Sequence, residues 1–290
     1  MKSNFFKEVR HLVREALRED LGLCGDVTSL ATVSARSRSL ARLVAKEDGV
    51  LCGVTVAVEA FRRMDRNSRI KVCVRDGARV RRGQTVLEVK GCTRGILVAE
   101  RVALNFVQRL SGIATLTRAF VKKSQISNLK SQILDTRKTT PLLRTLEKYA
   151  VTCGGGRNHR SGLHDMVLIK DNHLAALATT TRHPVRDAVR RARAMWPRLV
   201  IEVECDTLDQ VREAAESGAC IILLDNMTPA QLRRAVRIVD GRAKTEASGG
   251  VNLKTVAAIA RTGVDFISVG ALTHSARALD FSLEIVHESR

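Results

Sequence analysis

The chain lacks features that define two large classes of protein. Only 3% of its 290 residues are aromatic, with one Trp and one Tyr, which leaves little of the stacking surface that single-stranded nucleic acid binders use. No apolar run reaches the roughly 18 residues that a membrane-spanning helix needs. We therefore expect no nucleic acid and no membrane among its partners.

A disulfide framework and a secretory signal are also missing. The seven cysteines are odd in number and none are spaced as CxxC. No charged segment followed by an apolar stretch opens the chain. We expect reduced thiols and a cytoplasmic protein, and we interpret Cys153 as an inert thiol rather than a nucleophile.

Acidic residues are outnumbered by basic ones, 30 against 49, which gives a formal net charge of +19. A balance of this size is the usual signature of a protein that binds polyanions. Solvated helix faces such as 186–194, RDAVRRARA, account for part of it.

The stretch 133–173 gathers many of the other cations around two short apolar runs and a glycine triplet at 154–156. Its basic residues are Arg137, Lys138, Arg157, His159, Arg160 and Lys170. Cations that converge on strand ends indicate an anionic ligand. Its histidines, 159, 164 and 173, do not indicate zinc, because no Cys stands at ligand spacing and the surroundings are cationic.

The chain falls into two parts with different patterns of predicted helices and strands. The first part opens with an amphipathic helix at 4–19, followed by a loop in which Asp26, Thr28 and Ser29 are expected to bond to backbone. Extended runs between 40 and 89 then surround a helix at 54–64, and a long helix follows at 100–123. Gly112 is expected to bend that helix. The polar run 122–132 is predicted to be a linker or surface loop.

In the second part, strands alternate with helices. We expect strands at 133–134, 166–169, 199–203, 220–224, 243–246 and 266–269, and helices at 142–151, 185–195, 208–217, 229–239 and 253–261. Such alternation predicts a parallel sheet that closes into an incomplete barrel of the (β/α)8 type.

The working face of such a barrel lies at the carboxyl ends of its strands. The segments there are LDTRK, LIKDNH, EVECD, LLDN, EASGG and VGALTH. The first two supply cations, the next two supply carboxylates, and the last two supply glycines and small residues. We expect one site with a basic half, an acidic half and a backbone-lined pocket.

Each half admits more than one interpretation. Ser248, Gly249 and Gly250 precede a helix expected near Asn252 and are placed to bind a phosphate, although a plain tight turn is the alternative. Glu202 and Glu204 share one strand face and Asp225 ends the next strand. These carboxylates suit Mg²⁺ held with substrate phosphates, a developing cation, or pairing with nearby Arg and Lys.

The chain resembles the quinolinate phosphoribosyltransferases, also called decarboxylating nicotinate-nucleotide pyrophosphorylases. The matching motifs run in order along nearly the whole chain: EDLGLCGDVTS, ERVALNFVQRLSGIAT, LDTRKTTP with LEKYAV, GGGRNHRSGLHDMVLIKDNH, EVE, IILLDN, EASGGVN and TGVDFISVGALTHSARALDFSL. Departures are small. Leu142 stands where relatives often have glycine, and 179–194 is richer in Arg than the pattern requires.

This resemblance implies an α/β fold with an N-terminal α/β sandwich at 1–110, completed by the last strand at 277–290, and a barrel at 111–276. It implies a homodimer whose sites are shared between subunits, and it leaves further assembly, such as a hexamer of dimers, open. The substrates would be quinolinate and phosphoribosyl pyrophosphate, with Mg²⁺ as cofactor.

The resemblance also implies residue roles. Quinolinate would be held by Arg101 of the partner subunit together with Arg137, Lys138, His159, Arg160 and Lys170. Glu204 and Asp225 would face the ribose and Mg²⁺, and the 5-phosphate would lie against Ser248, Gly249, Gly250 and Gly270. Lys138, Lys170, Glu204 and Asp225 are the implied catalytic residues.

Two rivals remain at this point. One is a related phosphoribosyltransferase that acts on another base, such as the sister group associated with molybdenum transport loci. The other is a basic nucleic-acid-binding protein, whose affinity would fall steeply with salt.

Overall fold

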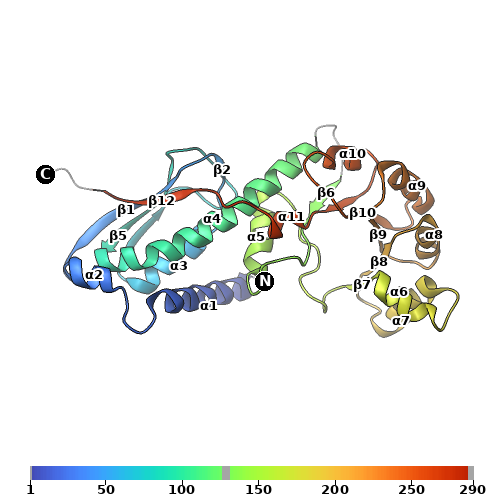
Figure 1. Ribbon diagram of the computed structural model, residues 1–290, viewed down its shortest axis with the longest axis horizontal. Coiled ribbons are helices and arrows are strands. Elements are labelled where there is room, and N and C mark those ends of the chain that lie inside the picture. Colours follow the sequence, from blue (N-terminus) through green and yellow to red (C-terminus); the bar gives the residue numbers. More distant parts are fainter. Residues whose placement is uncertain (1, 126–130, 287–290) are drawn as a thin grey trace. The chain divides into compact units, whose positions relative to one another are not determined.

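The computed structural model describes residues 2–125 and 131–286 (Figure 1). The chain divides into two compact units. One comprises residues 1–118, 140–155 and 276–290, and the other comprises 119–139 and 156–275. Among the described residues, no helix is long and apolar enough to cross a membrane.

The first unit is built on an antiparallel sheet in the order β12-β1-β5-β3. Its strands are β1 (Arg38–Ala45), β3 (Arg69–Val72), β5 (Thr85–Cys92) and β12 (Phe281–Val286), and a small ladder joins β2 (Gly49–Val50) to β4 (Arg79–Val80). β12 pairs with β1 along six positions, from Leu40 opposite Val286 to Ala45 opposite Phe281. The end of the chain therefore completes the sheet of its beginning.

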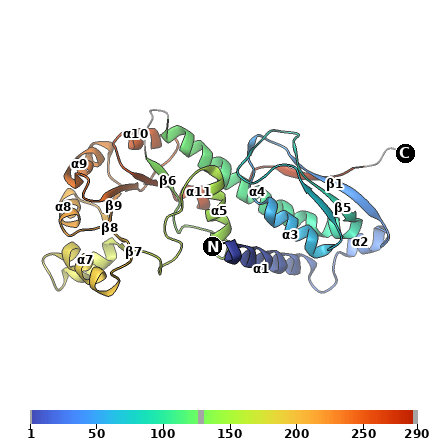
Figure 2. The ribbon, with the colours of Figure 1, turned by 180° about the vertical axis from the view of Figure 1, so that it is seen from behind.

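Helices cover one face of this sheet (Figures 1 and 2). They are α1 (Lys2–Leu21), α2 (Val27–Thr32), α3 (Val54–Met64) and α4 (Thr93–Ser124). A fifth helix of this unit, α5 (Arg144–Gly154), packs against α1 and α4 instead. Residues 27–32, predicted as loop, form α2 because the Asp26 carboxylate caps it by accepting from the Ser29 amide at 3.0 Å. The predicted hydrogen bond between Asp26 and nearby backbone is confirmed, but it caps a helix and does not stabilise a loop.

The long helix α4 starts seven residues earlier than predicted and runs continuously through Gly112. Glycine has a packing reason there: a Cβ at this position would overlap the carbonyl oxygen of Arg277. The helix also binds α5, since the buried Glu147 carboxylate lies 2.7 Å from Arg109 Nη2. This ion pair, the hydrogen bond from Tyr149 to Asp76 and the ring contact of Tyr149 with Phe5 tie residues 140–155 to the first unit, whereas the sequence predicts them in the barrel at 111–276.

The second unit holds a parallel sheet in the order β6-β11-β10-β9-β8-β7. Its strands are β6 (Gln132–Leu134), β7 (Val167–Ile169), β8 (Ile201–Cys205), β9 (Ile221–Asp225), β10 (Lys244–Ser248) and β11 (Phe266–Ser268). Leu134 also bridges Arg157 in parallel, which adds a chain segment beyond β6. The predicted α/β barrel architecture is confirmed, and within the described residues no ladder joins β7 back to β6.

Helices lie along the outer side of these strands (Figure 2). They are α6 (Asp171–Ala178), α7 (Pro184–Met195), α8 (Leu208–Glu216), α9 (Pro229–Val239) and α10 (Val256–Ala260). The short helix α11 (Ala271–His274) instead follows Gly270 at the carboxyl end of β11. α6 and α11 were not predicted, because helices of eight and four residues are too short to show a clear helical periodicity. Part of the predicted linker, 126–130, lies outside the described residues.

Candidate active site

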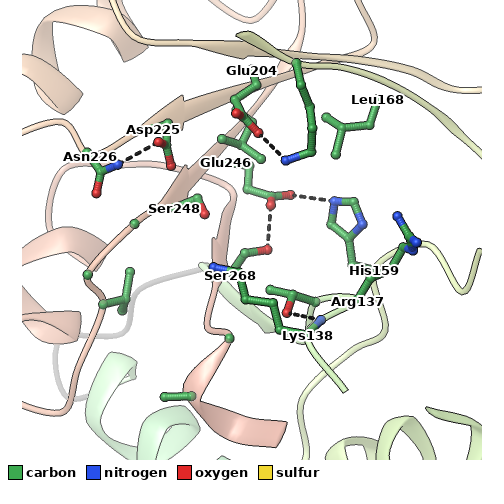
Figure 3. Close-up of a pocket in the computed structure, with 18 of the residues that line it drawn as sticks. Arg137, Lys138, His159, Leu168, Glu204, Asp225, Asn226, Glu246, Ser248 and Ser268 are labelled. Carbon is green, nitrogen blue, oxygen red and sulfur yellow. Dashed lines mark hydrogen bonds and ion pairs between the residues drawn. The ribbon is translucent and has the colours of Figure 1, made fainter. Parts of the chain in front are cut away.

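A cavity of about 760 Å³ opens at the carboxyl ends of the parallel strands. It lies wholly within the second unit and is lined by every residue to which the family resemblance assigns a role, except Arg101 (Figure 3). Those lining residues are Arg137, Lys138, His159, Arg160, Lys170, Glu204, Asp225, Ser248, Gly249, Gly250 and Gly270. Arg101 is exposed on α4 of the first unit.

The basic side of the cavity follows β6 and β7. Burial and the neighbouring charge of Arg137 lower the pKa of the Arg160 guanidinium, so these two cations are close enough to repel each other. The Nε of Arg137 is buried and has no hydrogen-bond partner within the described residues. An anion between these guanidiniums would satisfy that donor and relieve the repulsion.

The acidic side comes from β8 and β9. Glu204 Oε2 lies 3.0 Å from Lys170 Nζ, so one carboxylate of this side already faces a cation of the other. Asp225 Oδ2 accepts a hydrogen bond of 2.6 Å from the side-chain amide of Asn226. Asn226 was not predicted as a site residue. It holds a left-handed backbone with φ +53°, which Asn tolerates better than most residues.

The third wall is backbone. Gly249 and Gly250 have φ of +89° and +59°, and a Cβ on Gly249 would overlap Asn226 Oδ1. The helix predicted at 253–261 is present, but its expected start near Asn252 is wrong: α10 begins at Val256 and has only five residues, so a helix dipole adds little at the glycines. Gly270 instead directly precedes α11.

The floor of the cavity contains Glu246, a carboxylate that the sequence analysis does not predict, close to Glu202, which it does. Glu246 of β10 is fully buried and accepts from the Ser268 hydroxyl at 2.5 Å. Burial and the nearby carboxylate of Glu202 raise the pKa of Glu246 to about 8, and burial raises that of Glu202 to about 7. The alternation of Glu246 with Ser248, like that of Glu202 with Glu204, was the available signal.

His159 Nε2 lies 2.9 Å from Glu202 Oε2 and 3.6 Å from Glu246 Oε2. One His and two Glu are donors that can hold a metal. However, the Arg160 amide donates to His159 Nδ1 at 2.8 Å, which makes Nδ1 an acceptor and places the ring proton on Nε2. A protonated Nε2 has no lone pair for a metal. The cluster is a close contact of an imidazole with two carboxylates, in which Glu202 Oε1 and Oε2 and Glu246 Oε2 have no hydrogen-bond partner among the described residues.

The fold and the cavity together define an α/β protein whose cavity, at the carboxyl ends of parallel strands, is lined by cations, carboxylates and glycines. The chain belongs to the quinolinate phosphoribosyl transferase family: residues 26–111 match its N-terminal domain and residues 113–284 match its C-terminal domain. This confirms the resemblance found in the sequence.

Relatives match over almost their whole length. The nicotinate-nucleotide pyrophosphorylase [carboxylating] of Mycobacterium leprae is 46% identical, covering 97% of this chain and 98% of the relative. The probable nicotinate-nucleotide pyrophosphorylase [carboxylating] of Bacillus subtilis is 42% identical, covering 96% and 93%. The solved nicotinate-nucleotide pyrophosphorylase of Francisella tularensis superposes with a TM-score of 0.90 at 40% identity, covering 97% and 96%.

Proposed function

We propose that this chain transfers the phosphoribosyl group of phosphoribosyl pyrophosphate to quinolinate, with loss of CO₂. The products are nicotinate mononucleotide and pyrophosphate, and the step serves NAD biosynthesis in the cytoplasm. One observation carries the proposal: Arg137, whose buried Nε has no hydrogen-bond partner among the described residues, lines the same cavity as Arg160 and the carboxylates of Glu204 and Asp225.

The basic side suits the two adjacent carboxylates of quinolinate. Arg137, Lys138, Arg160 and Lys170 offer charge-assisted bonds, each worth roughly 1.5–3 kcal/mol. Three or four of these suffice for about micromolar capture after the entropy of association is subtracted. We assign Arg101 of a partner subunit to the same substrate, which makes the working unit a dimer.

The acidic side suits the reacting sugar. As pyrophosphate leaves, the anomeric carbon becomes oxocarbenium-like, and the fixed carboxylates of Glu204 and Asp225 stabilise its positive charge. The pyridine nitrogen then bonds to that carbon. When the 2-carboxylate then departs as CO₂, the electron pair left on C2 is stabilised by the adjacent pyridinium charge, and C2 takes up a proton from water to give nicotinate mononucleotide. Positioning and electrostatics thus suffice, without a covalent enzyme intermediate.

Mg²⁺ fits the same two carboxylates. Glu204 and Asp225 each keep an oxygen that is not engaged by the hydrogen bonds described above, and Mg²⁺ usually takes one or two protein carboxylates while keeping water and phosphate ligands. Bound there, it would neutralise charge on the pyrophosphate. Ser248, Gly249, Gly250 and Gly270 are assigned to the 5-phosphate.

A turnover assay tests the activity itself. Purified protein supplied with quinolinate, phosphoribosyl pyrophosphate and Mg²⁺ should release CO₂ only when all three are present. Turnover of another pyridine or base, with none of quinolinate, would favour the sister phosphoribosyltransferases instead.

The basic side has its own test, Arg137→Ala. Losing one bidentate partner should weaken quinolinate binding about 10- to 100-fold, from roughly 1.5–3 kcal/mol per bond, and should spare phosphoribosyl pyrophosphate. Equilibrium titration of each substrate measures this. Arg190→Ala, on the exposed face of α7, is the matched control. Unchanged quinolinate affinity in Arg137→Ala would refute the assignment.

A further inference from the structure

The short helix α11 has no part in the chemistry proposed above, yet it is bonded to the basic side of the cavity. Thr273 of α11 is fully buried, and its hydroxyl donates to the main-chain carbonyl of Lys138 at 2.7 Å. Among the described residues that line the cavity, Lys138 and Gly270 are present and Thr273 is not. Thr273 therefore reaches the site through another residue.

Lys138 lies at the centre of a three-residue turn. The Thr139 amide donates to the Arg137 carbonyl at 2.9 Å, and the Lys138 amide donates to the Thr136 hydroxyl at 3.0 Å. Both bonds are local to the turn. Of the three bonds described here, only the one from Thr273 comes from a distant segment of the chain, and it fixes the turn to the end of β11.

The Thr273 hydroxyl has a second acceptor within its own helix, the Gly270 carbonyl at 3.3 Å. A hydroxyl carries a single proton, and the shorter bond, to Lys138 at 2.7 Å, is the one with the usual O–H···O length. The proton is therefore directed across to Lys138, and the bond within α11 is secondary.

The Lys138 side chain also depends on the segment that leads into α11. Its charged end is exposed, but its stem passes close to Gly270, where a Cβ would lie 3.1 Å from Lys138 Cδ. A lysine side chain loses much rotamer entropy when it is held in one place. A fixed backbone and a fixed path for the stem leave less of that ordering to be done when an anion binds.

We propose that Thr273 is a positioning residue: its buried hydroxyl holds the turn from which Lys138 extends into the cavity, and so places the Lys138 ammonium for the dicarboxylate. The contact of Lys138 with quinolinate rests on the proposed function. Thr273 itself touches no substrate.

Thr273→Val keeps the shape of the side chain and removes the donor. Quinolinate affinity should fall about 5- to 20-fold, which is part of the loss expected for removing one charge-assisted bond. Affinity for phosphoribosyl pyrophosphate should stay within about twofold, and so should quinolinate affinity in Thr273→Ser, which keeps the hydroxyl. Equilibrium titration measures all of these. Thr262→Val is the matched control, since it removes another buried hydroxyl that donates to a backbone carbonyl.

Action through Lys138 predicts that the two substitutions are not additive. In a Lys138→Ala background no ammonium remains to be misplaced, so Thr273→Val should change quinolinate affinity by less than about twofold. A threonine that only supports the fold would weaken binding by the same factor in both backgrounds. Equal factors would therefore overturn the positioning role.

Hydrogen exchange tests the turn without any substrate. Amides at 137–139 should exchange about 3- to 10-fold faster in Thr273→Val, the size expected for losing one hydrogen bond, and at the original rate in Thr273→Ser. Mass spectrometry of the peptides that span the turn measures this. Thr273→Ala, which suits a helix, removes the same donor and serves if the valine variant does not fold. Unchanged exchange in a folded variant without the hydroxyl would refute the proposal.

Failure of the two proposals is distinguishable. Absence of quinolinate binding and turnover in the unsubstituted protein would remove the proposed function, while hydrogen exchange would still decide whether Thr273 holds the turn. Normal turnover, with quinolinate affinity unchanged in Thr273→Ala or Thr273→Val, would remove the role of Thr273 alone.

Discussion

Gly249 and Leu142 both hold a left-handed backbone, with φ of +89° and +65°, but for different reasons. At Gly249 a side chain is excluded by Asn226 as well as by φ. Leu142 is 82% exposed, so no neighbour requires its side chain. The sequence had marked Leu142 as a departure from the family pattern, where glycine is common, and the backbone supplies the physical reason.

We therefore expect Leu142→Gly to stabilise the protein. Left-handed backbone costs a residue with a Cβ roughly 1–2 kcal/mol, and glycine loses about 0.5–1 kcal/mol of extra entropy on folding. The net gain should be about 0.5–1 kcal/mol in the free energy of unfolding, measured by urea denaturation. Leu23→Gly, at an exposed position without positive φ, should show no gain. Equal effects of the two changes would contradict this account.

Helix α4 shows how packing overrules propensity within one element. It contains Gly95 and Gly112, and alanine is favoured over glycine by about 1 kcal/mol in a helix interior. A Cβ at Gly95 meets nothing nearer than 3.5 Å, whereas one at Gly112 overlaps backbone of Arg277. Replacing glycine by alanine should therefore stabilise the protein at position 95 and destabilise it at position 112.

Gly95→Ala should raise the melting temperature slightly, with a gain of up to about 1 kcal/mol. Gly112→Ala should lower it, because overpacking against rigid backbone costs typically about 1–3 kcal/mol and exceeds the propensity gain. Thermal unfolding by circular dichroism compares the two variants directly. A Gly112→Ala variant that is more stable than the unsubstituted protein would show that the backbone at 277–278 moves to make room for the added methyl group.

Buried carboxylates on strands β8 and β10 should make the free energy of unfolding depend on pH. The pKa of Glu246 is about 8 in the folded protein against an ordinary value of 4.5, so the folded state keeps a proton that the unfolded chain loses. Stability should fall as the pH rises from about 4.5 and should reach its full loss above about 8.

Glu246→Gln removes this ionisation and keeps an acceptor for Ser268. Urea midpoints between pH 6 and 9 should therefore decline less in the variant than in the unsubstituted protein. A smaller decline should remain, since Glu202, with a pKa of about 7, still titrates. Identical pH profiles would mean that Glu246 is already ionised in the folded protein at neutral pH.

At the scale of the whole molecule, the assignment of Arg101 to a partner subunit predicts complementation. Arg101→Ala and Lys170→Ala should each be inactive alone. In a mixed dimer, one site combines the intact Lys170 of one subunit with the intact Arg101 of the other. Random one-to-one mixing makes about half of the dimers mixed, with one working site in two, so about a quarter of full activity should return.

Mixed dimers are verified by two different affinity tags, purified in succession. No recovered activity in dimers proven to be mixed would mean that each site is complete within its own subunit.

The sequence by itself determined the alternation of strands and helices, because hydrophobic periodicity is local. It also located the cations after β6 and β7, the carboxylates after β8 and β9 and the glycines after β10, because parallel strands bring their carboxyl ends to one face. The structure gathers these residues in one cavity, and their roles remain predictions.

Only the tertiary structure decided what depends on distant neighbours. Strand order brought Glu246 next to His159, and residues 140–155 joined the first unit through side-chain contacts such as the ion pair of Glu147 with Arg109. Short helices such as α6 and α11 have too few residues for a periodic pattern to appear. Gly112 and Gly249 are fixed by backbone and side chains far away in the sequence, and no local pattern carries that information.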